Sequence, residues 1–481
     1  MDNLCKMIYY QVGKNLVYFP FKRALLLCGD DDESMDSIIN KNNFEIEAIE
    51  DVVYEEGDRS KKGNFVSNKY IIVPKSIQID PTTKCNLRCK YCFTDTGNIV
   101  ENSASLIQIE TLIKEAFKTV KIQNMLGGFG QNYVTIMISG GGEPTYDWGL
   151  FQAIVEYACL LSEQTGIKSI ISVTSNLQID DVKKLDFILS HCDHVHVSFD
   201  GYKEIHDYQR PREDKKSSFD VLDENLKYML SCTGKRCQYF GLRTTITNFN
   251  ADKMGDITKF VVKTYNGVKY IQYEPLNWVR KTNRKCDIFQ PSADVFVSGL
   301  FDSVKIGYEN ELNIESSFLD LISLRVRESF CDSVVGNSIA LNSDGDLVCC
   351  SEAIKNYDKN FHLFHVGHIN ENSSITWLKY TFPTNPMHHI CKNCYAFYHC
   401  GGGCLHSILD YSQNKKYRCA VSKAAIKHAF EMIIKGKGEY FKLKSYTKNV
   451  DNATLIYWIP EKIYTGYRSR VEYKEETPCI T

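Results

Sequence analysis

The sequence predicts an α/β protein built around a partial (β/α)6 TIM-like barrel, with a small α+β unit before it and a cysteine-rich domain after it. Between residues 75 and 276, short apolar runs typical of strands alternate with helical stretches of about ten to fifteen residues. Such alternation indicates βαβ units and a parallel sheet. Polar and glycine-rich segments follow the strand ends, where active-site groups of such barrels lie.

Length and composition describe an ordinary globular protein. At 481 residues the chain is long enough for two or three units, given roughly 100–200 residues per domain. A formal charge of −2 gives no reason to expect nucleic acid or an anionic membrane as a partner. No apolar stretch approaches the ~20 residues of a membrane span, and residues 1–7 lack a signal-peptide layout. We therefore expect a cytoplasmic protein.

The cysteine content is unusual for this class. There are 19 cysteines, and because cytosolic thiols are kept reduced, metal or cluster ligation explains them better than disulfides. Ten fall into the motifs described below. We expect most of the other nine to be small buried hydrophobic residues: Cys5, Cys28, Cys159, Cys192, Cys232, Cys237, Cys286, Cys349 and Cys479.

The N-terminal unit, residues 1–75, contains no catalytic motif. Apolar runs predict strands over 7–12, 16–19 and 24–28, and helical spacing follows over 34–43. Residues 55–67 are charged and contain glycine and serine, which suits a linker. The unit therefore has a role in recognition or in packing against the barrel.

The barrel, residues 76–284, has six predicted strands. They cover residues 77–80, 134–138, 169–173, 194–199, 242–246 and 270–273. Predicted helices between them include 105–122, 148–165, 180–190 and 219–230. A bridging region, 285–330, has amphipathic helical patterns over 294–308 and 316–328.

Three cysteines follow the first barrel strand directly. Cys85, Cys89 and Cys92 have C-x3-C-x2-C spacing, so the strand leads into a tight loop that directs three thiolates to one place. Three thiolates are one short of the four that an iron–sulfur cluster or a structural zinc takes, which leaves the open position that a catalytic metal needs. Part of a zinc knuckle and a redox loop are the alternatives.

This spacing, with Tyr91 just before the last cysteine, resembles the signature of the radical S-adenosylmethionine (SAM) enzymes. The resemblance implies that the three thiolates hold a [4Fe–4S] cluster whose unique iron binds SAM. The glycine-rich turn after the second strand resembles the family segment that binds the methionine amino group. Its residues are Gly140, Gly141, Gly142 and Glu143.

The later strand ends resemble the rest of the family's SAM pocket. Ser175 and Asn176 match the polar positions near the ribose and carboxylate, and Ser198 and Asp200 match an S-x-D-G segment. Arg210 matches an arginine often placed on the SAM carboxylate, and Gln272 would lie near the adenine. Ordinary polar residues at the barrel mouth are the alternative. Residues 211–215 replace the family's usual glycine, so that loop is a candidate for remodelling.

Seven further cysteines form an ordered pattern in residues 331–425. The pattern is C-x13-G-x4-C, a gap, C-x2-C-x5-C-x3-C, a gap, and C. It resembles the SPASM domain, which binds auxiliary [4Fe–4S] clusters, and a double zinc ribbon is the alternative. The resemblance gives one cluster four ligands and the other three: Cys391, Cys394, Cys400 and Cys419, and then Cys331, Cys350 and Cys404.

The fourth ligand of the second auxiliary cluster stays open between Cys349, Cys286 and a thiol of the substrate. A turn at 342–345 predicts a hairpin that carries Cys350. His362, His365 and His368 stand three residues apart, and we interpret them as structural. Residues 426–481 contain a helix and a tail with no recognised motif.

Together these resemblances predict three [4Fe–4S] clusters, bound SAM, a precursor peptide as substrate, and an electron donor such as flavodoxin or ferredoxin. We expect a maturase that joins a cysteine sulfur to carbon in a ribosomally made peptide, with carbon–carbon cross-linking second. Residues 1–75 resemble a reduced leader-peptide-binding module.

Two other functions remain open. An anaerobic sulfatase maturase would have an aspartate directly after Cys350, but Ser351 and Glu352 follow here. A non-catalytic, cluster-bearing scaffold that binds peptide is the last alternative.

Overall fold

The computed structural model describes most of the barrel and parts of the two ends. The described residues are 10–11, 16–19, 24–28, 73–126, 132–232, 235–237, 239–276, 287–319, 330–331, 338–353, 360–378, 391, 394–410, 412–441, 443–450 and 453–460. The predicted helix over 34–43, the segment 55–67, Cys286 and most of the predicted helix over 316–328 lie outside this set.

The prediction of an α/β fold with six parallel barrel strands is confirmed. Neighbouring strands pair in parallel in chain order. They are β4 (Ser76–Ile79), β5 (Tyr133–Ile138), β6 (Lys168–Ser175), β7 (His194–Ser198), β8 (Tyr239–Ile246) and β9 (Tyr270–Pro275).

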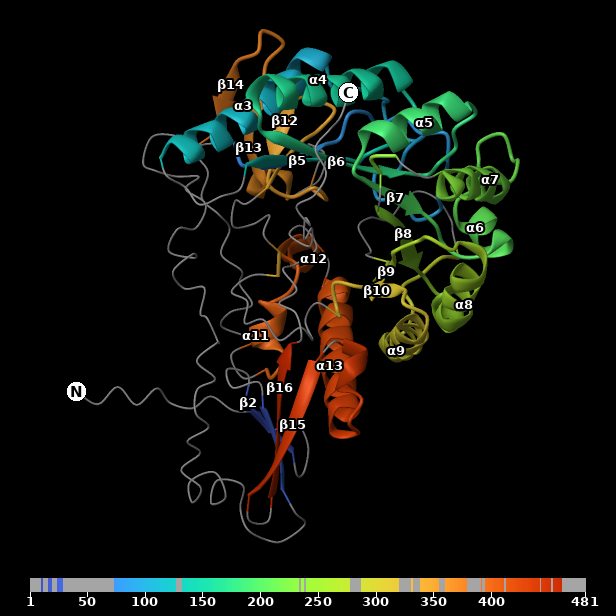
Figure 1. Cartoon of the computed structure of the whole chain (residues 1–481), viewed down its shortest axis with the longest axis vertical. Helices are drawn as coiled ribbons and strands as arrows, with labels where there is room; N and C mark the ends of the chain where they lie inside the picture. Colours follow the sequence, from blue (N-terminus) through green and yellow to red (C-terminus); the bar gives the residue numbers. More distant parts are fainter. Residues whose placement is uncertain are drawn as a thin grey trace, which may run out of the picture.

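Helices follow one another around the outer side of this sheet (Figure 1). They are α3 (Leu106–Met125), α4 (Trp148–Thr165), α5 (Val182–His191), α6 (Lys203–Gln209), α7 (Ser218–Ser231), α8 (Met254–Thr264) and α9 (Ala293–Glu309). Short polar residues cap several of them, as helix starts favour. Ser105 and Gln108 form a capping box on α3, and Asp147 caps α4 through the N–H of Leu150.

The two faces of the barrel sheet differ in polarity. Ile171 and Val173 of β6 are buried in the core under the helices, as is Val197 of β7. Because side chains alternate along a strand, the residues between them face the other way. That inner face carries polar residues such as Thr174 and Ser198. The sheet therefore presents a polar surface on the side away from the helices.

The barrel does not close, because further strands occupy both edges. The described residues form an eleven-stranded sheet in which β10 (Asn313–Glu315) pairs with β9 and β11 (Ile339–Leu341) pairs with β4, both in parallel. The predicted hairpin is present: β11 pairs with β12 (Asp346–Val348), and Gly345 has φ +85° in the turn. Antiparallel strands β13 (His365–Ile369) and β14 (Ile375–Trp377) extend it.

A second sheet joins the two ends of the chain. Its five described strands, in the order β1-β2-β3-β16-β15, are all antiparallel. The strands β1 (Tyr10–Gln11), β2 (Leu16–Phe19) and β3 (Ala24–Cys28) were predicted, whereas β15 (Leu443–Val450) and β16 (Ala453–Pro460) were not. The N-terminal strands therefore belong to one sheet with the C-terminal hairpin.

This second sheet packs on the C-terminal helices. Those helices are α11 (Phe397–Cys400), α12 (Leu405–Asp410) and α13 (Ser412–Ile434), and single 3-10 turns cover Ala251–Lys253, Phe361–Leu363 and Gly438–Phe441. Tyr18 of β2 is buried against Phe430 of α13 with ring centroids 4.6 Å apart, and its hydroxyl bonds to His399 of α11. Helix α13 crosses the predicted boundary between 425 and 426 without a break.

Candidate active site

The loop after β4, which carries the three motif cysteines, is tied down by hydrogen bonds. The N–H of Thr83 donates to the carbonyl of Asn102 at 2.9 Å, and the N–H of Asn102 donates to Thr83 Oγ1 at 2.8 Å. Between the cysteines, the N–H of Cys92 donates to the carbonyl of Cys89 at 3.1 Å. The chain therefore turns tightly between the last two motif cysteines.

A second loop, which follows α6, lies against the cysteine loop. The N–H of Arg88 donates to the carbonyl of Pro211 at 2.8 Å, and the N–H of Lys90 donates to the carbonyl of Gln209 at 2.9 Å. The loop 211–215, which we predicted to be remodelled, therefore contacts the cysteine motif through the backbone of its first residue, Pro211.

The three motif thiols influence one another electrostatically. Burial raises the pKa of Cys89 to about 12; the positive charge of Arg210 opposes this rise, and Cys92 adds to it. Burial also raises the pKa of Cys85, and Cys89, Glu143 and Cys92 raise it further. A cysteine thiol must lose its proton to bind metal. A bound cationic group would therefore stabilise the thiolate, which burial disfavours.

This donor set is of the kind that holds an iron–sulfur cluster. Among the residues that the structure describes, no group of three or more His, Cys, Asp or Glu side chains lies close enough to hold one metal ion. A cluster is larger than an ion and takes its thiolates on different iron atoms. Three neighbouring sulfur donors on one loop meet that demand. When bound, the cluster would be held by Cys85, Cys89 and Cys92.

The glycine-rich turn after β5 packs directly on the cysteine loop. A Cβ at Gly142 would lie 2.2 Å from the carbonyl oxygen of Lys84, and one at Gly140, where φ is +117°, would lie 1.8 Å from the Asp80 carboxylate. Gly141 between them is buried. The N–H of Glu143 donates to the carbonyl of Lys84 at 2.8 Å. The packing between the two loops therefore requires glycine at both flanking positions.

Glu143 connects the glycine turn to the end of β6. Its carboxylate accepts from Thr145 Oγ1 at 2.7 Å and from the N–H of Asn176 at 2.7 Å. Burial raises the pKa of Glu143, while the hydrogen bonds from Asn176, Thr145 and Ser175 act in the opposite direction. The structure therefore brings Glu143, Ser175 and Asn176 together.

Asn176 carries this connection on to the cysteine loop. Its Nδ2 donates to Asn86 Oδ1 at 2.8 Å and lies 3.8 Å from Cys85 Sγ. Asn86 Nδ2 in turn donates to the carbonyl of Gln178 at 3.2 Å. Sequence reasoning missed Asn86, although its place directly after the first motif cysteine was a usable signal.

Asp200 and Arg210 form a buried ion pair beside the same loop. Arg210 Nε donates to Asp200 Oδ2 at 3.0 Å and Nη2 donates to Oδ1 at 3.2 Å. The hydroxyl of Tyr91 donates to Asp200 Oδ2 at 2.5 Å, and the N–H of Thr245 donates to Oδ1 at 3.2 Å. The expected partner of Arg210 was the carboxylate of SAM; in this structure two of its donors bind Asp200.

Gln272 and Ser198 lie on the inner face of the sheet. Gln272 is 9% exposed, its Nε2 donates to Glu274 Oε1 at 3.3 Å, and its Oε1 is buried without a hydrogen-bond partner among the described residues. A donor on a ligand would satisfy that oxygen. Ser198 is half-buried at the end of β7. The two residues are therefore placed on the face that the barrel offers to a ligand.

Glu274, at the end of β9, is a half-buried acid that sequence reasoning did not single out. It accepts a hydrogen bond from Ser317 Oγ at 2.7 Å. Burial raises its pKa, and the hydrogen bonds from Ser317 and the charges of Arg418 and Arg243 oppose this rise. Because Arg418 belongs to α13, Glu274 lies where the barrel meets the C-terminal helices.

Two cysteines of the second field, Cys350 and Cys400, are influenced electrostatically by other cysteines of that field. Burial raises the pKa of Cys350 well above the usual range, and the charges of Glu352, Cys404 and Cys331 contribute to this rise. The outer two of these three cysteines, Cys331 and Cys404, are 73 positions apart in the chain. The three are the set for which the resemblance leaves a fourth ligand open.

Cys400 belongs to the other ligand set that the resemblance assigns. Burial raises the pKa of Cys400 to about 12, and Cys419 and Cys394 add to the rise. The N–H of Cys394 donates to the carbonyl of Cys391 at 2.8 Å. Cys391, the fourth cysteine assigned to this set, is therefore hydrogen-bonded to Cys394 through the backbone. These electrostatic contacts fall within the two ligand sets that the resemblance assigns.

Cys349 is 3% exposed and belongs to the hydrophobic core, and its N–H donates to the carbonyl of Phe364 at 2.8 Å.

His365 and His368 both contact the carboxylate of Asp346, at 3.2 and 3.0 Å. Their observed role is therefore in joining β12 to β13.

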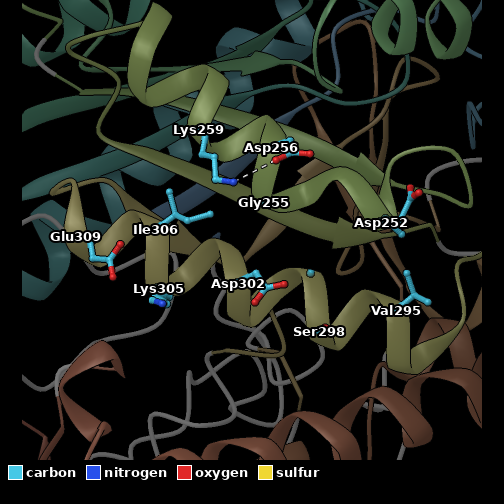
Figure 2. A pocket seen from close by; sticks show the side chains of 12 residues that line it. Asp252, Gly255, Asp256, Lys259, Val295, Ser298, Asp302, Lys305, Ile306 and Glu309 are labelled. Carbon is cyan, nitrogen blue, oxygen red and sulfur yellow. Dashed lines mark hydrogen bonds and ion pairs between the residues drawn. The ribbon is translucent and has the colours of Figure 1, made fainter.

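A groove on the outer side of the barrel lies apart from these residues. It has a volume of about 620 Å³ and runs between α8 and α9, where Asp256, Asp302 and Lys305 line it (Figure 2). Its lining contains none of the predicted site residues.

No helix among the described residues is long and apolar enough to span a membrane.

Comparison with known proteins gives a family match and several relatives. Residues 79–261 match the model of the Radical SAM superfamily. The chain is 26% identical over 358 residues to a cysteine-type anaerobic sulfatase-maturating enzyme of Clostridium novyi, which spans 68% of this chain and 87% of the relative. It is 22% identical over 430 residues to the radical SAM cyclopropyl synthase TigE of Paramaledivibacter caminithermalis, spanning 82% and 80%.

Among solved structures, native anSMEcpe with bound AdoMet has a similar fold. The TM-score is 0.56 at 20% sequence identity, and the match covers 76% of this chain and 99% of that one. The similarity extends beyond the residues matched by the superfamily model. It therefore supports the fold assignment for part of the C-terminal half as well.

Proposed function

This chain belongs to the radical SAM superfamily, and on that premise we propose that it is a maturase that installs a cross-link in a ribosomally made peptide. The bond we expect is a thioether between a cysteine sulfur and carbon. The observation that carries the proposal is a three-cysteine loop followed, in the same chain, by seven further cysteines in an ordered pattern. The relatives named for maturation and cyclopropyl synthesis support a peptide substrate.

Residues of the chain would divide the work as follows. Cys85, Cys89 and Cys92 would hold the SAM-binding [4Fe–4S] cluster, and the glycine turn with Glu143, Ser175 and Asn176 would hold SAM beside it. When bound, the cluster and SAM would supply the radical chemistry that removes a hydrogen atom from a substrate carbon, and the auxiliary clusters would accept the remaining electron as the cysteine thiol loses its proton. The polar inner face of the sheet, including Ser198 and Gln272, would orient the adenosyl group and the substrate.

The two cysteine groups after β11 would bind two auxiliary clusters, which makes three clusters in all. Cys391, Cys394, Cys400 and Cys419 supply four thiolates and would close one site. Cys331, Cys350 and Cys404 supply three, and the observed burial of Cys349 in the core favours a ligand from elsewhere. A cysteine of the substrate peptide would complete this site and bring its sulfur next to the radical.

The first test measures the radical chemistry. Purified anaerobically with a chemical reductant and SAM, the wild-type protein should form 5′-deoxyadenosine and contain about twelve irons per chain. The triple variant Cys85→Ala/Cys89→Ala/Cys92→Ala should form none and retain about two thirds of the iron. Cys159→Ala, a cysteine outside both fields, is the matched control and should behave as wild type. Persistent 5′-deoxyadenosine in the triple variant would refute the assignment.

The second test identifies the product. Co-expression with a short cysteine-containing reading frame beside the gene should give a peptide that has lost two hydrogen atoms per cross-link and kept its sulfur. Formylglycine formation, which the sulfatase-maturating relative makes a second candidate, would replace the thiol with an aldehyde oxygen and lose the sulfur. High-resolution mass spectrometry separates these outcomes. An unchanged peptide under conditions that support SAM cleavage would favour a different substrate.

A further inference from the structure

Asn102, in the segment between the cysteine loop and α3, uses its backbone to hold the stem of that loop. Its N–H donates to Thr83 Oγ1 at 2.8 Å, and its carbonyl accepts from the N–H of Thr83 at 2.9 Å and from Thr82 Oγ1 at 3.1 Å. Thr82 Oγ1 also accepts from the N–H of Lys84, at 3.1 Å. The backbone of Asn102 therefore holds the three residues that directly precede Cys85.

The side chain of Asn102 contacts a different element, the turn of the hairpin between β11 and β12. Its Nδ2 donates to the carbonyl of Ser343 at 3.0 Å and to Asp344 Oδ1 at 2.7 Å. These two contacts use both hydrogens of the amide, and Oδ1 accepts from the N–H of Ser103 at 2.9 Å. One residue therefore joins the stem of the cysteine loop, through its backbone, to the hairpin, through its side chain.

The hairpin turn is held by its own hydrogen bonds and leads directly to Cys350. Asn342 Oδ1 accepts from the N–H of Asp344 at 2.9 Å and from the N–H of Asp346 at 2.8 Å. Strand β12 ends two residues before Cys350. Pairing of β11 with β4 fixes the first strand of the hairpin, and Asn102 fixes its turn. A shift of the turn would therefore move β12 and, with it, Cys350.

We propose that Asn102 is a positioning residue that aligns the cysteine loop with the hairpin that carries Cys350, and so sets the distance between the SAM-binding cluster and the auxiliary cluster that Cys350 would help to hold. This inference rests on the proposed function, because it concerns those two clusters. Asn102 is exposed, and water competes for hydrogen bonds at exposed positions. Its side-chain contacts should therefore matter for geometry more than for the free energy of unfolding.

The test reverses the polarity of one contact. Asn102→Asp keeps the shape of the side chain and its backbone contacts with the cysteine loop, but places a carboxylate against the carboxylate of Asp344. Asn102→Asp combined with Asp344→Asn restores a donor and an acceptor with their roles exchanged. Asp344→Asn alone keeps an acceptor oxygen and should resemble wild type. Asn98→Asp is the matched control, because Asn98 Nδ2 donates to Asp95 Oδ1 at 2.8 Å within the same loop and does not contact the hairpin.

Two readouts report alignment rather than folding. Pulsed electron paramagnetic resonance of the reduced full-length protein measures the distances between the SAM-responsive cluster and the auxiliary clusters, and it needs no peptide. Asn102→Asp should broaden this distance distribution about twofold, and the double variant should restore it. With the peptide from the neighbouring reading frame, 5′-deoxyadenosine formed per cross-link should rise about tenfold in Asn102→Asp, because misplacement of reacting groups by about 1 Å costs up to about a hundredfold. The double variant should return to within about threefold of wild type, with iron content unchanged throughout.

The outcomes separate this inference from the proposed function. A wild-type protein without clusters would contradict both. A wild-type protein with clusters but no cross-linked product would contradict the proposed function alone, because the cluster distances still decide the role of Asn102. Unchanged distances in Asn102→Asp would refute the positioning role, as would an equal disturbance in Asn98→Asp or a double variant that does not recover. Parallel loss of iron, 5′-deoxyadenosine and product in Asn102→Asp would make Asn102 a structural residue of the loop and would also refute it.

Discussion

The chain contains two cysteine regions that are built in different ways. In the first, Cys85, Cys89 and Cys92 lie on one short loop after β4, and backbone hydrogen bonds from Arg88 and Lys90 fasten that loop to its neighbour. In the second, seven cysteines between 331 and 419 come from separate segments of the chain. The first motif therefore depends on the geometry of one loop, whereas the second depends on how several segments fold against one another.

The largest expected effect tests whether the two regions act separately. Cys394→Ala combined with Cys400→Ala removes two thiolates from one auxiliary group while leaving the loop after β4 unchanged. We expect cross-linked peptide to fall below detection while 5′-deoxyadenosine formed without product stays within about threefold of wild type. Both quantities are measured by chromatography and mass spectrometry. Loss of 5′-deoxyadenosine as well would show that the regions depend on each other.

The next effect concerns the packing that fastens the first region. Gly142→Ala would put a Cβ 2.2 Å from the carbonyl oxygen of Lys84, so the cysteine loop must move. We expect bound iron to fall by about a third and 5′-deoxyadenosine by about tenfold or more, for a cost of about 1–3 kcal/mol. Gly149→Ala, where the nearest atom is 3.9 Å away, is the control and should change neither. Normal activity in Gly142→Ala would contradict the packing.

Acid sensitivity should distinguish the first region further. Burial lowers the pKa of His206 to about 4, although the charge of Asp200 opposes this, while its usual value is near 6.5. In the unfolded chain His206 therefore binds a proton below about pH 6.5, whereas in the folded chain it binds one only below about pH 4. Stability should be fully present above 6.5 and fall by about 2 kcal/mol by pH 5.

The measurement is urea unfolding at pH 8 and pH 5, with His206→Asn as the comparison. Other groups also titrate in this range, so the informative quantity is the difference between wild type and variant in their loss of stability. The variant should lose about 2 kcal/mol less than wild type between the two pH values. Equal losses in both proteins would show that His206 does not contribute.

The smallest effect concerns the exposed edge of the first region. Arg88 Nη2 lies 2.9 Å from Glu213 Oε2, but the side chain of Glu213 is 71% exposed. Solvent screens such pairs, so Glu213→Gln should change the free energy of unfolding by less than about 1 kcal/mol. Activity should change by less than about twofold. A larger loss would mean that the 211–215 loop fastens the cysteine loop through this side chain as well as through its backbone.

The sequence predicted the parts that depend on local pattern. The six barrel strands and the hairpin before Cys350 were found because apolar alternation and a turn with Gly345 are short-range signals. The cysteine loop and the glycine turn were found because their spacing is local. The need for glycine at Gly142, by contrast, arises from the carbonyl of Lys84, a contact that no spacing reveals.

What sequence reasoning missed depends on pairing between distant segments. Neither β15 nor β16 was predicted; among the described strands β15 pairs only with β16, and β16 is joined to the rest of its sheet through β3, at the other end of the chain. The contact between Arg210 and Asp200 was missed for a related reason. Each residue was assigned separately to the SAM pocket, and a contact between the two was not considered. Their mutual bond follows from two strand ends meeting, which only the fold shows.

The sheet made from both chain ends has a consequence for how the protein is made. Cys28 of β3 pairs with Ala453 of β16, about 425 positions later. At about 5–20 residues per second, the ribosome needs roughly 20 to 90 seconds to deliver that partner. During this time the edge of β3 that later pairs with β16 has no strand beside it. Unpaired strand edges favour aggregation. Slow translation of the last 40 residues should therefore lower the yield of folded protein, and coordinated expression of a chaperone should restore it.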